Sequence, residues 1–287
     1  MSAQTLRAAS FLDKGGTGKT TAVAHLGVAM AELGHNVLLI DLAGKQGDLV
    51  KHFGEWTTVQ DEIDPDDDWP NISTVFDETW EKIADKLGDQ AVDDLIIETD
   101  EGPDLIPAHP GLDSLDAELG NIDDAHERYS RLDDFLTEYI DPLGYDIVLI
   151  DLPGLTNNVS YNGLWAAQNV FAPVEMGPFE SEQARALEDD LDLIADKFGI
   201  GVELVMVLPN KLDSRTKLSE EYLDDFETAY PNSIASQPIP MSQDIRNAAD
   251  RGQTAFELEN PSTTAKRAQE AFLTNAEELV DQLRRNA

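Results

Sequence analysis

The 287-residue sequence contains no cysteine. The chain can therefore form no disulfide, no thiolate metal site and no cysteine nucleophile. It also lacks an apolar run of about 18 residues, the length from which a transmembrane helix is inferred. Its N-terminus has no basic region followed by an apolar stretch, as a signal peptide would have. We therefore expect a cytoplasmic protein that does not enter the membrane.

Basic residues are scarce. The chain has 20 Lys and Arg against 57 Asp and Glu, which gives a formal net charge of −37. Such a charge destabilises a compact fold through self-repulsion, but at 1 M salt the screening length falls to about 3 Å. Because the acids are spread over the whole chain, we interpret them as an adaptation to high salt, as in a halophile. The alternative is a basic partner that covers an acidic face.

The most informative segment is a glycine-rich loop that follows the phosphate-binding pattern ending in G-K-[ST]. Its residues are Lys14, Gly15, Gly16, Thr17, Gly18, Lys19, Thr20 and Thr21. Glycines let successive backbone N–H groups turn toward phosphate oxygens. Lys19 supplies a positive charge for the β- and γ-phosphates, and Thr20 supplies a hydroxyl for Mg²⁺. We therefore expect a nucleotide-binding loop. A glycine-rich turn without function is the alternative.

The segments on both sides of the loop support this expectation. Leu6–Leu12 is a short, mostly apolar run, which is typical of a buried parallel strand. After the loop, apolar residues recur every three or four positions from Val23 to Leu33, which predicts a helix with one buried face. Gly34 follows where a helix C-cap glycine belongs. A strand, loop and helix in this order place an anion at a helix N-terminus, which favours negative charge.

Strand-like and helix-like segments alternate along the rest of the chain. This alternation predicts an α/β fold with a doubly wound, mostly parallel sheet and helices on both faces, as a single domain over residues 1–287. An irregular, acidic excursion is predicted at about residues 54–92. The other predicted strands are Asn36–Asp41, Leu95–Glu98, Asp104–Pro107, Ile147–Asp151, Asn169–Val174 and Val202–Leu208. The other predicted helices are Thr79–Leu87, Leu112–Leu119, Ala125–Ile140, Ser181–Phe198 and Thr263–Leu283.

Two of the predicted strands end in aspartate, Asp41 and Asp151. In doubly wound sheets, ligands bind beyond the carboxyl ends of the strands. Both acids, together with Thr20, could therefore face the loop's Mg²⁺, partly through water, because Mg²⁺ keeps much of its hydration. An apolar strand followed by an aspartate is the Walker B arrangement. The alternative is a strand-end acid that caps the next helix.

Lys14, the lysine ahead of the glycines, makes the loop resemble the deviant Walker A motif of the ParA/MinD ATPases. Other segments resemble the ParA (Soj) branch of this family: Asp104–Ala108 with Leu112–Leu119, Tyr145–Pro153, Asn162–Ala167 with Pro173–Glu175, Ile239–Ala249 and Glu259–Ser262. The likeness covers most of the chain except residues 54–92. It implies the P-loop NTPase fold, ATP and Mg²⁺ as cofactors, and ATP hydrolysis. P-loop reductases with an iron–sulfur cluster are excluded, because their cluster needs cysteine ligands.

The resemblance also implies roles for single residues. Lys14 would reach across a homodimer closed over ATP, which couples dimerisation to the nucleotide as an arginine finger does. Lys14, Lys19 and Asp41 would form the catalytic site. Asn210 would hydrogen-bond adenine, since an amide offers both a donor and an acceptor, and the backbone after Pro240 would line the base. For Asn210, a structural role in a turn is the alternative.

One position departs from the family pattern. ParA proteins usually carry Asp-x-Asp at the end of the second strand, and the second Asp supports hydrolysis. Here Ala43 occupies that position, and an alanine cannot orient water. Asp48, Gln46 or Lys45 could substitute. We therefore expect ATP binding and dimerisation with weak or altered turnover.

The resemblance implies two further partners, nonspecific DNA and a ParB-like adaptor protein. The candidate DNA-binding residues are Arg215, Lys217, Arg246, Arg251, Lys266, Arg267, Arg284 and Arg285. Helix-surface cations that balance nearby acids are the alternative. MinD relatives end in a basic membrane helix, but the acids in residues 277–285 argue against membrane binding here.

The leading interpretation is a ParA-type ATPase that partitions or positions DNA or another cargo. Two alternatives stay open: a nucleotide-binding regulatory or scaffolding protein with little hydrolysis, and a MinD-like positioning ATPase. A small-molecule kinase or ligase on the same loop would need a substrate pocket that the sequence does not reveal.

Overall fold

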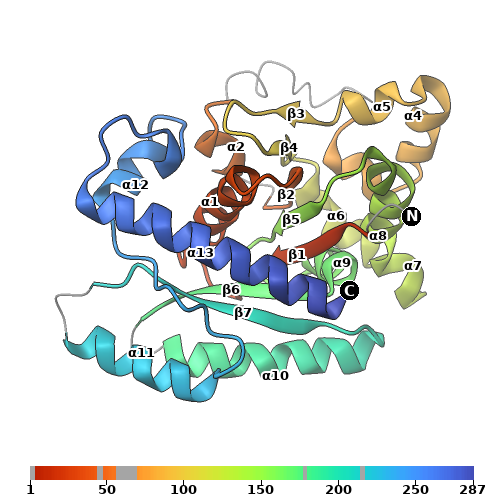
Figure 1. Ribbon diagram of the computed structural model, residues 1–287. Coiled ribbons are helices and arrows are strands. Elements are labelled where there is room, and N and C mark those ends of the chain that lie inside the picture. Colours follow the sequence, from red (N-terminus) through yellow and green to blue (C-terminus); the bar gives the residue numbers. More distant parts are fainter. Residues whose placement is uncertain (1–3, 44–47, 56–69, 177–179, 214–216) are drawn as a thin grey trace.

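A computed structural model describes residues 4–43, 48–55, 70–176, 180–213 and 217–287. In this part of the chain, seven strands form one sheet in the order β3-β4-β2-β5-β1-β6-β7 (Figure 1). All neighbouring pairs are parallel except β3 and β4. The strands are β1 (Leu6–Ser10), β2 (Val37–Asp41), β3 (Ile97–Glu98), β4 (Asp104–Ile106), β5 (Ile147–Asp151), β6 (Asn169–Glu175) and β7 (Glu203–Asn210). The predicted doubly wound, mostly parallel sheet is confirmed.

The central strands are buried on both faces. Every residue of β2 and β5 is buried, and successive side chains point to opposite faces. Leu38 and Ile40 belong to one hydrophobic cluster, while Val37 and Leu39 belong to another. A strand of this kind reads as a continuous apolar run, which is why these strands were predicted almost residue by residue.

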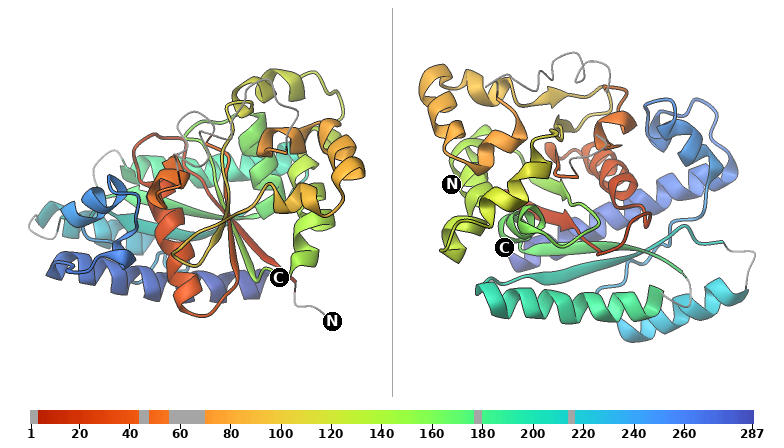
Figure 2. Two further views of the ribbon diagram at one scale, coloured as in Figure 1. Left: turned by 90° about the horizontal axis from the view of Figure 1, so that it is seen from above. Right: turned by 180° about the vertical axis from the view of Figure 1, so that it is seen from behind.

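Helices cover both faces of the sheet (Figure 2). The first face packs against α1 (Lys19–Glu32), α2 (Asp48–His52), α12 (Gln243–Ala249) and α13 (Thr263–Asn286). The second packs against α4 (Thr79–Leu87), α5 (Gln90–Asp93), α6 (Leu112–Leu119), α8 (Arg131–Phe135), α9 (Asn158–Ala167), α10 (Glu180–Phe198) and α11 (Lys217–Ala229). The described chain also contains α7 (Ala125–Tyr129), a π-helical turn, η2 (Leu136–Ile140), and three short 3₁₀ turns: η1 (Ile72–Phe76), η3 (Asp141–Leu143) and η4 (Ala255–Glu257).

Helix α1 ends as its sequence predicts. Gly34 has φ +89°, a left-handed conformation that favours glycine. Its N–H donates to the Ala31 carbonyl at 2.9 Å, and the His35 N–H donates to the Met30 carbonyl at 3.1 Å. These two bonds are the Schellman motif, which satisfies carbonyls left free at the helix end.

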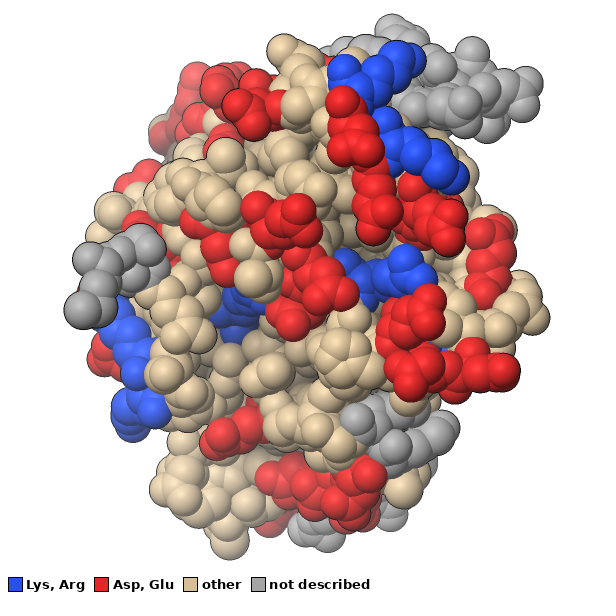
Figure 3. Space-filling view, turned by 90° about the vertical axis from the view of Figure 1, so that its right-hand side faces the viewer, with Lys and Arg blue, Asp and Glu red and all other residues tan. Residues whose placement is uncertain are grey.

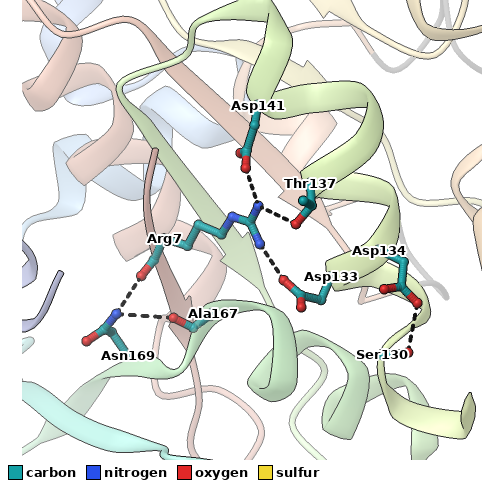
Figure 4. A network of polar contacts seen from close by, with 8 residues as sticks. All are labelled: Arg7, Ser130, Asp133, Asp134, Thr137, Asp141, Ala167 and Asn169. Carbon is teal, nitrogen blue, oxygen red and sulfur yellow. Dashed lines mark hydrogen bonds and ion pairs between the residues drawn. The ribbon is translucent and has the colours of Figure 1, made fainter. Parts of the chain in front are cut away.

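The predicted helix Ala125–Ile140 is wrong as one continuous element. It is divided into α7, α8 and a π-helical turn, η2 (Leu136–Ile140). The Arg7 side chain of β1 binds Asp133, Thr137 and Asp141, which lie before, within and after the π turn (Figure 4). A π turn changes the direction of the side chains around it and often marks a functional position.

The acidic excursion is more regular than predicted. The helix Thr79–Leu87 is confirmed as α4, but η1 and α5 were not predicted. Buried residues of all three elements, among them Phe76, Trp80 and Val92, belong to the core of the second face. Residues 56–69 of the excursion lie outside the described residues.

Candidate nucleotide-binding site

The glycine loop lies between the end of β1 and the start of α1, as the motif predicts. Gly16 and Gly18 have φ +82° and +94°, which explains glycine at both positions. Space is a second constraint at Gly18, where an added Cβ would lie 2.5 Å from Nδ2 of Asn210. The loop therefore has a backbone that other residues could not adopt without strain.

Lys19 is held against the loop's own backbone. Its ammonium group donates to the Leu12 carbonyl at 3.0 Å and to the Lys14 carbonyl at 2.8 Å. Burial lowers the pKa of Lys19, and the nearby carboxylates of Asp151 and Asp13 oppose this shift. The β5–α9 connection approaches closely, since a Cβ at Gly154 would lie 3.1 Å from the Lys19 nitrogen. Within the described residues, the hydrogen bonds of this ammonium go to neutral carbonyls, which leaves its charge well placed to bind phosphate.

Three adjacent strands place polar side chains in one row beneath the loop. Ser10 of β1 is in register with Asp151 of β5, which is in register with Asp41 of β2. All three are fully buried. The Ser10 hydroxyl donates to Oδ1 of Asp151 at 2.9 Å. The predicted convergence of the two strand-end acids is therefore a direct result of strand register.

The two acids share a strained electrostatic environment. Burial, and then the charge of Asp151, raise the pKa of Asp41 to about 7. Burial raises the pKa of Asp151 to about 6, against the hydroxyls of Thr20 and Ser10 and the Lys19 ammonium. Two carboxylates in low dielectric resist ionising together. A cation bound beside them would favour the ionised forms.

The residues present fit a magnesium ion. Oδ2 of Asp151 is buried and has no hydrogen-bond partner among the described residues, and neither does the buried Thr17 hydroxyl. Such groups usually find a partner, and Mg²⁺ prefers oxygen ligands. Thr20 and Asp151 would hold the ion, which would neutralise phosphate charge.

Asp41 makes different contacts. Its Oδ1 accepts the Ala43 N–H at 2.9 Å, and its Oδ2 accepts the Leu49 N–H in the first turn of α2 at 3.3 Å. The helix-capping alternative is therefore part of its role, and its contact with a metal would be indirect.

Asn210 and Pro240 lie beside the loop, in a cavity of about 70 Å³. Its other lining residues are Gly18, Thr21, Lys211, Ile239, Met241, Ser242, Ile245, Arg246 and Phe272. Asn210 is the last residue of β7 rather than the residue after it. Its amide N–H donates to the Thr17 carbonyl at 2.8 Å, and its Oδ1 accepts the Lys211 N–H at 2.9 Å. Asn210 thus supports the glycine loop whether or not it also contacts a base.

Comparison with known proteins agrees with this geometry. Residues 8–203 match a family model described as an AAA domain. The chromosome partitioning protein ParA of Caulobacter vibrioides (strain NA1000 / CB15N) is 30% identical over 254 residues, which is 88% of this chain and 87% of that protein. The chain belongs to the ParA/MinD-type P-loop ATPases.

Solved structures share the fold of this ATPase. An aspartate-to-alanine variant of Cyanothece McdA in complex with ATP has a TM-score of 0.73 at 20% identity, with 96% of both chains covered. Cobyrinic acid a,c-diamide synthase from Mycobacterium smegmatis with bound ADP and magnesium has a TM-score of 0.65 at 26% identity. That match covers 93% of this chain and 91% of the synthase.

Lys211 is a site residue that the sequence did not reveal. Its ammonium group contacts the Gly16 carbonyl and the Glu175 carboxylate, and so ties the glycine loop to the end of β6. Its φ of +53° is unusual for a residue other than glycine. Ser10 was missed too, although a polar residue at the end of an apolar strand was a usable signal.

The structure describes one of the three residues that were predicted to substitute for the missing catalytic aspartate. Asp48 begins α2 and pairs with Lys51 at 3.1 Å, and its charge further raises the pKa of Asp41 after burial and Asp151. Lys45 and Gln46 lie outside the described residues.

Within the described chain, no helix combines the length and the apolar character that a membrane crossing requires.

The candidate DNA-binding cations do not form one described cluster. Lys266 and Arg267 are exposed on α13, whereas Arg284 pairs with Asp281 at 3.6 Å, and Arg285 donates to the Asp281 carbonyl at 3.0 Å. Arg246 lines the cavity beside Asn210. Arg215 and the Lys217 side chain lie outside the described residues.

Proposed function

We propose that the chain is a ParA-type positioning ATPase, which binds ATP with Mg²⁺, closes into a homodimer and positions DNA or another cargo. The observation that carries the proposal is the row Ser10, Asp151 and Asp41 at the strand ends beneath a loop with two lysines. Both acids of this row are buried and have raised pKa values, and Mg²⁺ with a nucleotide would favour their ionised forms. Membership in the ParA/MinD-type family supports the same proposal.

The nucleotide would replace contacts that the chain now makes with itself. Phosphate oxygens would take the place of the Leu12 and Lys14 carbonyls at the Lys19 ammonium. Lys14 would contact the phosphates bound by a second copy. Adenine would lie against the Asn210 and Pro240 cavity, where the Asn210 amide keeps a second N–H for the base.

Dimerisation is tested by sedimentation velocity with ATP, ADP or no nucleotide, in buffers from about 0.2 M to 3 M KCl. We expect a dimer with ATP alone. Lys14→Ala should still bind ATP but stay monomeric, whereas Lys19→Ala should lose ATP binding. Lys82→Ala, an exposed lysine on α4, is the matched control. A Lys14→Ala protein that dimerises like the unchanged chain contradicts the role of Lys14.

Turnover is the step at which Ala43 matters. We propose weak hydrolysis, with Asp48, Gln46 or Lys45 as the residue that substitutes. Of these, Asp48 belongs to the described residues, and its charge acts on both buried acids. A steady-state ATPase assay in high-salt buffer, with Asp48→Ala, Gln46→Ala and Lys45→Ala, tests this. A rate typical of ParA proteins that none of the three changes affects would refute it.

Cargo is tested separately. Lys266→Ala with Arg267→Ala should weaken DNA retention by the ATP-bound dimer if α13 contributes to DNA binding, and binding should decrease as salt rises. Glu277→Gln with Glu270→Gln is the control on the same helix. If the dimer forms but binds no DNA, and turnover stays negligible with DNA present, a nucleotide-dependent scaffold is the better description.

A further inference from the structure

We infer that the proposed nucleotide site accepts guanine as well as adenine, with Ser242 and Arg246 as residues that contact the base. This rests on the proposed function, and it extends the ligand from ATP to the purine nucleoside triphosphates. The base would enter the cavity of about 70 Å³ beside the glycine loop. That volume holds about two waters, so it fits the polar edge of a base, and the rest of the nucleotide would lie outside it.

The cavity and the glycine loop are connected by contacts that fix their relative position. The Asn210 amide donates to the Thr17 carbonyl at 2.8 Å, and the Lys211 ammonium contacts the Gly16 carbonyl. Both side chains belong to residues that line the cavity, as does Gly18 of the loop. A base in the cavity would therefore belong to the nucleotide whose phosphates lie in the loop.

Backbone N–H groups on the other side of the cavity are already paired. The Ile239 N–H donates to the Pro209 carbonyl at 2.8 Å, and the Met241 N–H donates to the Leu212 carbonyl at 3.0 Å. Pro240, which lies between them, has no N–H. A protein selects one base most sharply with fixed hydrogen-bonding groups, because the wrong base leaves them unpaired. The paired N–H groups of residues 239–241 are not available for this, so side chains must distinguish the bases.

Ser242 has a hydroxyl that the described chain does not use. The residue is 7% exposed and lines the cavity, and its Oγ is buried without a hydrogen-bond partner among the described residues. It occupies the N-cap position of α12, where a serine usually accepts a backbone N–H, but its side chain makes no such bond. An unpaired buried hydroxyl costs stability. The edge of a base in the cavity would give it a partner.

The two purines differ at position 6. Both carry the N7 acceptor, but adenine carries the N6 amino donor beside it, whereas guanine carries the O6 acceptor. A hydroxyl both donates and accepts, so Ser242 can accept from the adenine amino group or donate to guanine O6. The second N–H of the Asn210 amide can donate to N7 of either base. Neither side chain therefore excludes guanine.

Arg246 adds a donor that favours guanine. It lies about one helical turn after Ser242 and lines the same cavity. A guanidinium only donates, so it matches the O6 and N7 acceptors of guanine, which arginine often binds. Basic residues are scarce in this chain, and acidic side chains clearly outnumber them on the side where α4 and α8 lie (Figure 3). An arginine beside the loop therefore departs from the general character of the surface.

The experiment measures competition between nucleotides for the full chain, with Mg²⁺ at about 1 M KCl. An ATP analogue that carries a fluorophore on its ribose is displaced by ATP, GTP or CTP. The three competitors have the same phosphates, so the ratios of their affinities report on the base. We expect GTP to bind within about 10-fold of ATP, whereas a site with fixed groups for adenine would reject guanine by about 10⁴-fold. CTP lacks N7 and should bind at least about 5-fold more weakly than either purine nucleotide, the size of one lost hydrogen bond.

Variants test the two side chains. Ser242→Ala should weaken the binding of ATP and GTP alike, by about 5-fold, and should not lower the melting temperature of the nucleotide-free chain. Ser160→Ala, which removes a buried hydroxyl that is hydrogen-bonded, should lower the melting temperature and leave both affinities unchanged. Arg246→Ala should weaken GTP binding at least about 3-fold more than ATP binding. Arg251→Ala, an exposed arginine after the end of α12, is the matched control and should leave the ratio unchanged.

Three results would overturn guanine recognition by these residues. In the first, GTP binds more than about 10-fold more weakly than ATP. In the second, Ser242→Ala destabilises the chain as Ser160→Ala does and leaves both affinities unchanged. In the third, Arg246→Ala changes the ratio of the two affinities no more than Arg251→Ala.

The nucleotide series also separates this inference from the function on which it rests. ATP binding with much weaker GTP binding would refute guanine recognition and leave the proposed ATPase function standing. Failure of the chain to bind any of the nucleotides would contradict both. Because the series uses the unchanged chain, it decides the question even where a variant fails to fold.

Discussion

The two ends of strand β1 differ in how the buried charged side chains there are paired. At its amino end, Arg7 is 12% exposed and pairs with Asp133 at 2.6 Å and Asp141 at 2.8 Å (Figure 4). At its carboxyl end lie two buried acids, Asp41 and Asp151, whose pKa values are raised above the ordinary range. At the amino end, the charge of Arg7 is paired with two carboxylates, and this contact is structural. At the carboxyl end, burial disfavours the ionised forms of both acids, and a magnesium ion beside them would favour those forms.

The largest effect is expected at the amino end. Arg7→Ala leaves two partly buried acids without their cation, so we expect the free energy of unfolding to fall by about 2–4 kcal/mol. This is below the full value for a buried pair, because both acids are about one-third exposed. Urea unfolding at fixed salt measures it.

If the amino end of β1 has only a structural role, the same change should leave nucleotide binding unaffected. The affinity for a fluorescent ATP analogue should stay unchanged in Arg7→Ala. Arg131→Ala, which breaks a more exposed ion pair with Glu127, should cost less than about 1 kcal/mol. Equal destabilisation by the two changes would mean that Arg7 has no special structural role.

The next effect concerns pH at the carboxyl end. The folded pKa values of about 7 and 6 for Asp41 and Asp151 exceed the ordinary value of 3.8. Between about pH 4 and pH 7 the folded chain therefore holds protons that the unfolded chain releases. We therefore expect the contribution of these two carboxyls to the free energy of unfolding to fall as pH rises through this window, by up to about 1.4 kcal/mol per pH unit for each proton.

Asp151→Asn should remove part of this dependence. Between pH 5 and pH 7 we expect the variant to lose about 1 kcal/mol less stability than the unchanged chain. ATP with Mg²⁺ should reduce the dependence in the unchanged chain, since a cation favours ionised carboxylates. Denaturant titrations at the two pH values measure both effects, with Asp250→Asn as an exposed control. A variant with the same pH dependence as the unchanged chain would show that Asp151 does not titrate in this window.

A smaller effect is expected at Ser10. Ser10→Ala removes the hydroxyl that donates to Asp151, at a cost of about 1 kcal/mol. The pKa of Asp151 should rise further. The pH at which Mg²⁺ binds with half of its maximal affinity, measured in the presence of ADP, should therefore be higher in the variant than in the unchanged chain. Ser160→Ala on α9 removes another buried hydroxyl and should cost similar stability without moving the pH profile. Identical profiles for the two variants would remove Ser10 from the metal site.

The smallest effect is expected at Gln168, a residue at the end of helix α9 near the amino end of strand β1. This residue caps α9 with φ +56°, a conformation that favours glycine. Gln168→Gly should stabilise the chain by about 0.5–1 kcal/mol, with unchanged ATP affinity. Gly34→Ala, at φ +89°, should destabilise it by a similar amount. Thermal unfolding compares the two, and a Gln168→Gly chain that is less stable would indicate that the glutamine side chain makes a contact worth more than the strain.

Much of the fold was predictable because its pattern is local. Strand β5, Ile147–Asp151, and helices α4 and α6 were predicted with the bounds that they have. The contacts of Arg7 around the π turn were not predictable, because Arg7 is 126 residues away from Asp133. For the same reason the contact between Lys211 and Gly16 left no signal in the sequence, since the two are 195 positions apart.

The sequence by itself determined a strand, a phosphate-binding loop and a helix, and it determined that two strands end in aspartate. Only the tertiary structure decided how their charges are balanced. Strand register aligned Ser10, Asp151 and Asp41 in one buried row, and packing gave Arg7 two acids at the opposite end. Desolvation and pairing depend on neighbours that are distant in the chain. An aspartate in the sequence can therefore belong to either end, and its role follows from the contacts that the fold provides.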